Sequence, residues 1–382
     1  MSNSMMIPQE IFDLIYLVSC AVNQEQPDKT RCAEMELKKV YSVAFRHALS
    51  VCASLALERV VELPEYFIEA KYKTIRRLAL YEKERQKLFD LFEDNGIWYL
   101  PLKGIVIKNY YPKTAMREMS DNDILVDNKK LYDAKTIMQG MGYSCINFEK
   151  IHHDVYKKSP GLCFELHRTL FDKNTAAKIY DYYLNIKKNL IKDNNNKFGY
   201  HMTNEDFYIY ILCHLYMHYK SGGTGLRSLL DLYVFNKRFG QSLDWEYIVS
   251  ELRKLGIAGF EHDVAELAGK TFSFGELSES EIKELIFFIN SNSHGSFENR
   301  MAKKLQNDDS AKAKLKYILR RLFPPKNVLE SRFPAVCRHC YLYPILIVYR
   351  SFIVLVKSRK RIINEVKQLK HFKRIENRGK YN

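Results

Sequence analysis

The chain has 382 residues, of which 46% are hydrophobic, 16 are Gly and 10 are Pro. This composition allows two or three domains with substantial cores and excludes a low-complexity or extensively disordered chain. The formal net charge of +15 favours a polyanionic partner such as nucleic acid, nucleotide phosphates or an acidic membrane surface. Ten Lys or Arg residues stand against two Glu residues in 357–380, so the total charge says little about an active site.

The first 95 residues are predicted to form a helical region. Apolar residues recur there at intervals of three and four over 7–22, 32–57 and 65–95, which is the period of an amphipathic helix. No secretory signal is recognised at the start, and the eight cysteines are scattered. We therefore expect free thiols in a reducing cytoplasm.

Residues 96–172 are predicted to form a small α/β core, because short apolar runs alternate there with helical patterns. A helix at 104–111 ends before Pro112, and a second helix covers 129–138. The turn Ser159-Pro160-Gly161 separates the last two strands. The predicted strands are 97–102, 122–126, 143–147, 152–158 and 162–170.

The rest of the chain is predicted to be helical again, as a helical domain at 173–322 and a C-terminal unit at 323–382. Helices are expected at 204–220, 226–239, 245–255, 259–267 and 279–290. The C-terminal unit combines an apolar segment at 340–356 with the basic tail. That segment is shorter than a membrane-spanning helix and contains Arg350. It is either a docked terminal helix or an interfacial helix whose basic tail meets acidic lipid.

Three acidic residues lie on two of the predicted core strands. Asp121 and Asp123 stand at the start of the strand 122–126, where alternation places them on one face. Two neighbouring carboxylates repel unless a cation separates them, and hard oxygen ligands suit Mg²⁺. If the strand that contains Glu165 pairs beside 122–126, three carboxylates can bind two Mg²⁺ ions for in-line phosphoryl displacement. The alternative is that Glu165 pairs with a Lys or Arg at a sheet edge.

Residues near these acids can bind phosphate. Gly104 lets the backbone approach a phosphate, the following helix offers unpaired N–H groups, and Lys103 adds a charge. Arg117 either contacts phosphate, braces the loop or forms a surface salt bridge. His167 shares a strand face with Glu165 and either reaches a phosphate or packs within the sheet.

Two further patterns are compatible with zinc binding. His214 and His218 are one helical turn apart and can face one ligand, although packing is the alternative. Cys337 and Cys340 form one C-x-x-C pair without a second pair. Because a zinc site needs four ligands, we expect these two thiols to be incidental.

The arrangement of these motifs resembles the DNA polymerase β-like nucleotidyltransferase superfamily. More narrowly, it resembles a poorly characterised bacterial family of nucleotidyltransferases, over about residues 70–340. The helical segments 212–218 and 226–232 also resemble that family. The motifs that carry the resemblance are Leu102-Lys103-Gly104, Tyr110-Tyr111-Pro112, Arg117, Asp121-Asn122-Asp123-Ile124-Leu125-Val126 and Glu165-Leu166-His167.

The resemblance implies an α+β fold, with a small mixed-sheet core flanked by N-terminal and C-terminal helical regions. It implies transfer of a nucleotidyl group from a nucleoside triphosphate to an unidentified acceptor hydroxyl, with release of pyrophosphate. Asp121, Asp123 and Glu165 would bind two Mg²⁺ ions, with Mn²⁺ as the alternative, or Glu165 would draw the acceptor proton. The nucleotide would meet Lys103, Gly104, Arg117, His167, His214, Arg227 and Asp231.

Two departures from the superfamily pattern leave a second interpretation open. The turn has Lys103-Gly104 where Gly-Gly or Gly-Ser is usual, and the spacer from Gly104 to Asp121 is longer than the commonest form. The chain would then be a catalytically degenerate protein that binds nucleotide or polyanion. The expected location is the cytoplasm, with attachment to the inner face of the membrane through the tail as the alternative.

Overall fold

The computed structural model describes residues 7–149, 152–173 and 176–291, together with positions 310, 312, 319 and 346. The predicted C-terminal apolar segment and the basic tail therefore lie, apart from single positions, outside the described residues. The pair Cys337 and Cys340 also lies outside them. Within the described part, no helix combines the length and apolarity that crossing a membrane requires.

The N-terminal region is helical, as predicted, but 32–57 is broken into separate helices. Asp28 begins one of them by accepting a hydrogen bond from the backbone N–H of Arg31. Ala48, with φ of 53°, ends the next one in the left-handed conformation. The helices are α1 (Gln9–Asn23), α2 (Lys29–Glu34), α3 (Leu37–His47), α4 (Ser50–Leu57) and α5 (Glu65–Asp94).

Five strands form one mixed sheet in the order β1-β2-β5-β4-β3, which confirms the predicted α+β fold. Strands β2 and β5 are parallel, and the other neighbours are antiparallel. Each of the five predicted core strands is present, some shorter than expected. Their bounds are β1 (Tyr99–Pro101), β2 (Asn122–Val126), β3 (Ser144–Asn147), β4 (His153–Lys158) and β5 (Leu162–His167).

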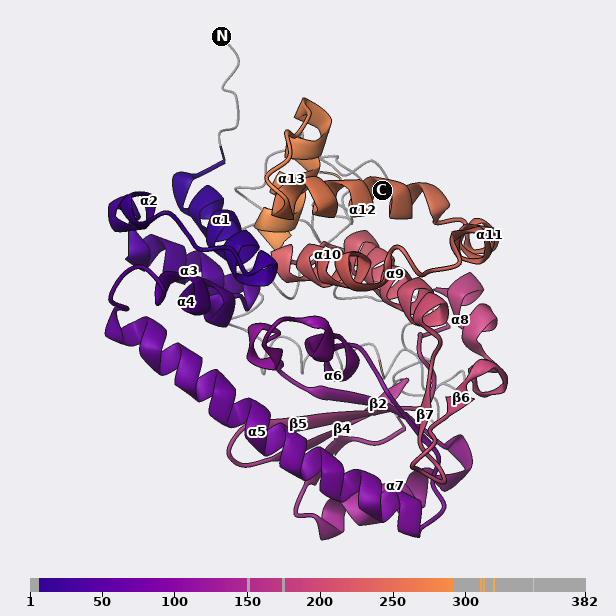
Figure 1. Cartoon of the computed structure of the whole chain (residues 1–382). Coiled ribbons are helices and arrows are strands. Elements are labelled where there is room, and N and C mark those ends of the chain that lie inside the picture. The colour runs from indigo at the N-terminus through magenta and orange to yellow at the C-terminus, as the bar shows by residue number, and fades with distance from the viewer. Residues whose placement is uncertain are drawn as a thin grey trace.

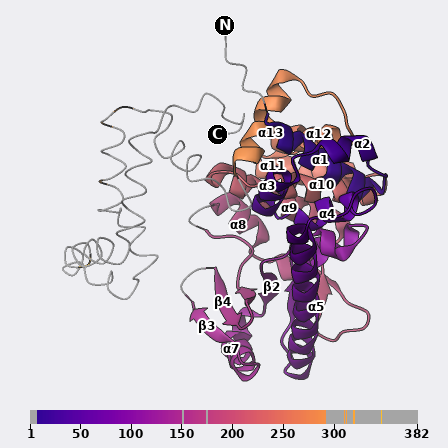
Figure 2. The same cartoon turned by 90° about the vertical axis from the view of Figure 1, so that its left-hand side faces the viewer.

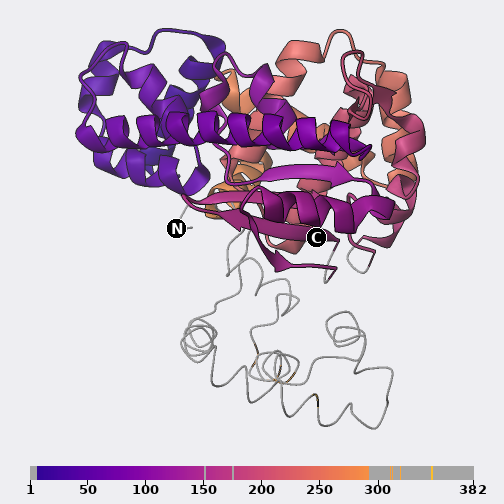
Figure 3. The same ribbon diagram turned by 90° about the horizontal axis from the view of Figure 1, so that it is seen from below.

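One face of this sheet is covered by helices α5 and α7 (Leu131–Gly140), which lie across it in Figure 3. Ile124 and Val126 of β2 and Phe164 and Leu166 of β5 belong to the hydrophobic core on that side. Because successive side chains of a strand point to opposite faces, Asp123 and Glu165 point to the other face. The alternation of apolar and polar residues thus determines where the acids lie.

The helices that follow the sheet pack beside the N-terminal helices and above α6 (Gly104–Ile107) (Figure 1). Side-chain caps define two of their starts: Thr203 accepts from the N–H of Asp206, and Asp244 from that of Tyr247. These helices are α8 (Ala177–Tyr183), α9 (Asn204–Ser221), α10 (Leu226–Phe239), α11 (Trp245–Leu255), α12 (Ala258–Phe272) and α13 (Glu279–Ser291).

The chain is predicted to return to helix after residue 172, but the segment between the sheet and α9 is only partly helical. It contains α8, the 3-10 turn η4 (Ile186–Asn189) and the hairpin of β6 (Ile191–Lys192) and β7 (Tyr200–His201). The N–H of Tyr99 in β1 donates to the carbonyl of Phe198, which ties this hairpin to the sheet. The domain boundaries given above stay a prediction.

Candidate functional site

The three predicted acids gather at one cavity. The register of the parallel pair places Asp123 of β2 directly beside Glu165 of β5. Asp121 immediately precedes β2, and its Oδ2 accepts a hydrogen bond of 3.0 Å from Ser120 Oγ. All three acids line a cavity of about 230 Å³, whose walls come from α6, β2, β5, α9 and α10. The site thus lies between the sheet face that α5 and α7 do not cover and the helices α9 and α10.

Asp123 is buried between two cationic or proton-donating groups. Its Oδ1 accepts hydrogen bonds of 2.8 Å from both Lys103 Nζ and His167 Nε2. Burial alone would raise the pKa of Asp123, but Lys103 and His167 hold it well below its usual range. Asp123 is therefore a carboxylate at neutral pH.

Glu165 shows the opposite behaviour. Burial, together with the negative charges of Asp123 and Asp121, raises the pKa of Glu165 to about 7. Two acids side by side therefore differ in protonation. A further cation between them would remove the repulsion that Glu165 experiences.

The donor set fits a divalent cation. Atoms of Asp123, Glu165 and His167 lie within 4.8 Å of one another, and Asp121 supplies another carboxylate at the same cavity. Carboxylate oxygens are the ligands that hard cations prefer. The residues present therefore suit the predicted metal.

The turn at Lys103 differs from the expected phosphate-binding turn. Helix α6 has only four residues and continues as the 3-10 turn η1 (Lys108–Tyr110). The N–H groups of residues 105–107 already donate to the carbonyls of Leu102 and Lys103. At residues 105–107 the expectation of N–H groups free for phosphate is therefore not met. The ammonium of Lys103 is also engaged, because it binds Asp123.

Arg117 forms a buried ion pair rather than the surface salt bridge that the sequence left open. Its Nε donates to Oδ1 and Oδ2 of Asp231 on α10, at 2.7 and 3.0 Å. Tyr111 also donates to Asp231 Oδ1, at 2.8 Å. Burial would lower the pKa of Arg117, but Asp231 raises it overall. This Arg117–Asp231 clamp joins the loop before β2 to α10 across one side of the cavity.

Arg227, also on α10, is the cation most available for an anionic ligand. It lines the cavity and donates from Nη1 to the carbonyl of Glu118 at 3.1 Å. No carboxylate of the described chain segments lies within ion-pair distance of it. Burial and the charge of Arg117 lower the pKa of Arg227 to about 10. The hydroxyls of Thr224 and Ser228, which the sequence did not single out, line the cavity beside it.

The two histidines of α9 also line the cavity. Nε2 of His214 and Nε2 of His218 are 3.1 Å apart, and burial holds the pKa of His214 well below its usual range. Among the described residues, the groups that could hold a metal do not include this pair. The structure therefore lends no support to a zinc site there.

Of the predicted nucleotide-binding residues, His167 is the one that does not line the cavity. It is 2% exposed and packs behind Asp123. The other six do line the cavity: Lys103, Gly104, Arg117, His214, Arg227 and Asp231.

Sequence reasoning missed two histidines next to the acids. His153 Nε2 lies 3.5 Å from Glu165 Oε2, and His152 precedes it. Burial lowers the pKa of His152 to about 3 and that of His153 to about 4. A signal was available, because an antiparallel pairing of the strands about the turn at 159–161 places His153 opposite His167.

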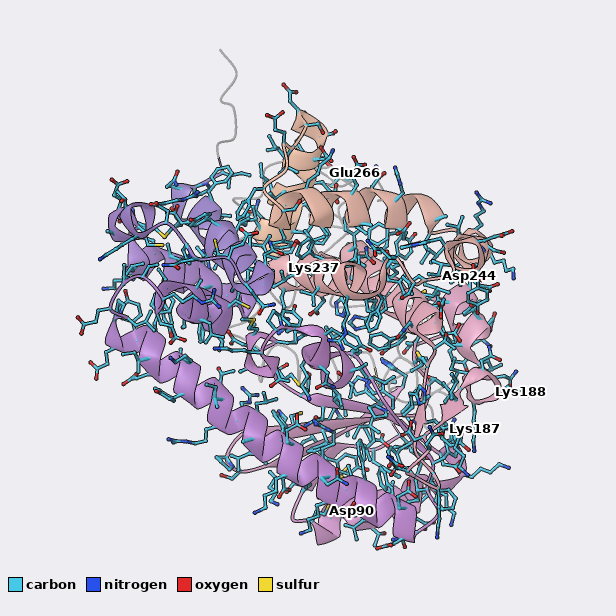
Figure 4. The ribbon with its side chains drawn as sticks, viewed as in Figure 1. Asp90, Lys187, Lys188, Lys237, Asp244 and Glu266 are labelled. Atoms are coloured by element: carbon cyan, nitrogen blue, oxygen red, sulfur yellow. The ribbon has the colours of Figure 1, made fainter. Side chains whose placement is uncertain are left out.

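The charges of the cavity differ in position from the many charges on the outer surface. Figure 4 marks Asp90 on α5, Lys187 and Lys188 near β6, and Glu266 on α12, all at the periphery. The cavity instead gathers acids on the side of the sheet and arginines on the side of α10.

The family model described as "Uncharacterised nucleotidyltransferase" matches residues 33–273. These residues include the sheet, the acids, the Arg117–Asp231 clamp and the helices α9 to α12. Comparisons with curated proteins and with solved structures found no match. The chain belongs to the uncharacterised nucleotidyltransferase family.

Proposed function

We propose that this protein is a Mg²⁺-dependent nucleotidyltransferase. It would transfer a nucleotidyl group from a nucleoside triphosphate to an acceptor hydroxyl and release pyrophosphate. The observation that carries the proposal is the strand register that places Asp123 beside Glu165, with Asp121 on the same cavity. Family membership supports nucleotidyl transfer in general.

The acids would hold the metal and position the acceptor. Asp121, Asp123 and Glu165 would be the ligands, and Mn²⁺ is the alternative ion. Bound metal would neutralise charge on the reacting phosphate and polarise it. The acceptor oxygen would form a bond to the α-phosphorus while the bond to the leaving pyrophosphate breaks. Glu165 would be either the third ligand or the base that takes the proton of the acceptor hydroxyl, and its pKa of about 7 in the chain without metal suits the second role.

The helical side of the cavity would bind the phosphates. We assign this role to Arg227, because it lines the cavity and is not paired with a carboxylate in the part of the chain described here. Lys103 would keep Asp123 ionised through their 2.8 Å contact. Arg117 and Asp231 would hold α10 in place through the clamp, and His214 would contribute to the wall around the nucleotide.

A degenerate, binding-only protein is the second candidate, and one contact favours it. Lys103 Nζ already sits on Asp123 Oδ1, where a metal would bind in an active enzyme. The N–H groups of residues 105–107 are also engaged. Such a protein would bind nucleotide through Arg227 without turnover.

The test is transfer of label from α-phosphate-labelled nucleoside triphosphates, with Mg²⁺ or with chelator, to RNA, protein and small-molecule acceptors. Pyrophosphate release is followed in parallel. We expect metal-dependent transfer by the wild type, loss in Asp121→Ala and Glu165→Gln, and no change in Asp90→Asn. Asp90 is an exposed control on α5 (Figure 4) and does not line the cavity.

Two results would decide against the proposal. Equal transfer by the wild type and the acid variants would overturn the site assignment. Nucleotide binding without pyrophosphate release, across all acceptors and both metals, would favour the degenerate protein instead. Calorimetry of nucleotide binding to Arg227→Gln tests the phosphate-binding role of Arg227. Nucleotide binding should weaken in this variant whether the protein is an active enzyme or a binding-only protein.

A further inference from the structure

Three histidines form a cluster at the end of the sheet, behind the acids. His153 of β4 faces His167 of β5 in register, and His152 precedes β4. One ring nitrogen of each histidine lies within 4.8 Å of the others. The ring centroids of His152 and His153 are 4.5 Å apart, and those of His153 and His167 are 5.0 Å apart. The proposed nucleotidyl transfer gives the pair His152 and His153 no role.

The rings of His152 and His153 contact each other through one nitrogen each. His153 Nε2 is 3.5 Å from Glu165 Oε2, and His152 Nδ1 is 4.0 Å from Asp172 Oδ2. The facing nitrogens, His152 Nε2 and His153 Nδ1, are 3.2 Å apart, the separation of a hydrogen bond between the two rings. A bound metal ion would take a lone pair from both nitrogens in place of that hydrogen bond.

This distance matches a metal chelate. Nitrogens bound tetrahedrally to Zn²⁺ at about 2.0–2.1 Å are separated by about 3.3 Å. The 3.2 Å separation of the two facing nitrogens therefore allows both to bind one Zn²⁺ ion with little change in their spacing.

His167 provides a second, independent observation. It is 2% exposed, and its Nε2 binds Asp123. Its Nδ1 is buried and has no hydrogen-bond partner among the described residues. Buried polar atoms rarely remain without a partner, and a bound ion can supply the one that is missing.

We propose that His152, His153 and His167 bind a Zn²⁺ ion, with Glu165 and Asp172 orienting the rings of His153 and His152. Imidazole nitrogens suit zinc and other borderline ions, whereas Mg²⁺ prefers oxygen. A carboxylate behind a ligating histidine fixes its tautomer and its ring. Three protein ligands leave a fourth position for water or another ligand. This site lies next to the Mg²⁺ site, because Glu165 contacts His153 and His167 binds Asp123 through its other nitrogen. Zinc binding itself does not depend on nucleotidyl transfer.

The first experiment titrates Co²⁺ into the full-length protein after removal of metals by chelation. Co²⁺ replaces Zn²⁺ in tetrahedral sites and gives visible d–d absorption. We expect one equivalent of Co²⁺ to produce these bands and Zn²⁺ to abolish them by displacement. Metal analysis of the zinc-loaded protein should give one bound ion. The absence of the bands, or their persistence in excess Zn²⁺, would contradict the proposal.

The second experiment locates the site. His152→Ala and His153→Ala should lose the bands, and Asp172→Asn should weaken binding by about tenfold, as expected for a group that orients a ligand. His262→Ala, an exposed histidine of α12 with 77% side-chain exposure, is the matched control and should bind normally. Wild-type binding by both histidine variants would place the metal elsewhere and overturn the proposal.

Two further readouts keep the result interpretable. Circular dichroism and urea unfolding check each variant, and His153→Gln replaces His153→Ala if the latter does not fold. Asp121→Asn should keep the Co²⁺ bands whether or not it loses transferase activity. Failure of the zinc site and failure of the proposed function are thereby distinguished.

Discussion

Asp123 is held by two donors on a single oxygen, and this arrangement has consequences for the residues around it. Lys103 and His167 both approach Oδ1 at 2.8 Å, and the side chain of Asp123 is only 7% exposed. A buried carboxylate that loses one such partner keeps its negative charge but loses part of the positive charge and hydrogen bonding that stabilised it. The stability of the site therefore depends on Lys103 as well as on the acids.

We expect Lys103→Met to destabilise the fold by about 1–3 kcal/mol, the range for a buried polar group that loses one of its partners, because His167 still binds Asp123. Lys39→Met is the matched control, because Lys39 pairs with Glu36 on the exposed surface and such pairs contribute less than about 1 kcal/mol. Urea unfolding measures both. An equal effect of the two substitutions would show that the Lys103–Asp123 contact does not stabilise the fold.

The raised pKa of Glu165 predicts how stability depends on pH without divalent metal. The pKa of Glu165 is about 7 in the folded chain, against 4.5 as the ordinary value. Between these two pH values the folded state binds more protons than the unfolded state, so this group's contribution is lost as pH rises. We expect Glu165→Gln to gain stability relative to wild type from pH 5 to pH 8 in chelator.

Thermal unfolding of both proteins at each pH checks this prediction. Mg²⁺ added at pH 8 should stabilise the wild type more than Glu165→Gln, because the carboxylate is then a ligand. A difference between the two proteins that stays constant with pH would refute the assignment of the shift to Glu165.

At the scale of elements, the Arg117–Asp231 clamp links the segment before β2 to α10. Arg117 follows the 3-10 turn η2 (Thr114–Met116), and Asp231 accepts from both Arg117 and Tyr111. Both partners are largely buried. The clamp therefore fixes the position of α10 relative to the acids of the sheet.

Asp231→Asn should destabilise the protein by about 3–5 kcal/mol, because it leaves the buried guanidinium of Arg117 without its counter-charge. Tyr111→Phe should cost less, about 1.5–3 kcal/mol, because it removes one hydrogen bond to a charged group. Urea unfolding measures which of the two variants loses more stability. The reverse order would mean that the ion pair contributes little and that Tyr111 holds the segment.

Local patterns predicted the sheet well. Alternation within Asn122–Val126 and Leu162–His167 separated core residues from acids correctly, and the register brought Asp123 beside Glu165. The hairpin of β6 and β7 was not predictable, because each strand has only two residues and the hairpin is held in place by a contact with β1. The breaks within 32–57 were also missed. One of them depends on Ala48 in a left-handed conformation, which an alanine does not predict.

The candidate site was only partly predictable for a similar reason. The residue types of Asp121, Asp123 and Glu165 identified the acidic side. The partners of Lys103 and Arg117 could not be foreseen, because they are set by how distant segments pack. Asp231, for example, is 114 positions from Arg117.

At the scale of the whole molecule, helices from both ends of the described chain share one hydrophobic core. Residues of α1, α3 and α4 belong to the same buried cluster as those of α9 to α13. The side chain of Asn23, at the end of α1, donates to the carbonyl of Phe272, at the end of α12. Helix α5 then runs from this helical body down beside the sheet (Figure 2). The N-terminal helices are thus part of the support for the cavity's helical wall.

We expect Leu17→Ala, at a fully buried position of α1, to cost about 2–5 kcal/mol through the cavity it leaves. Because α1 and α12 are in contact, amide hydrogen exchange should accelerate in α12 as well as in α1. Phe12→Ala on the same helix, where the side chain is 44% exposed, is the control. Acceleration limited to α1 would show that the N-terminal helices unfold as a separate unit.

The backbone at Lys103 is strained, and this strain accompanies the placement of one positive charge beside Asp123. Its φ of 45° lies in a region that glycine adopts freely and that a residue with a Cβ atom enters at about 1–2 kcal/mol. A glycine would relax the peptide, yet it would leave Asp123 without its ammonium. The sequence motif Lys-Gly is therefore a compromise between an unstrained corner and a neutralised acid.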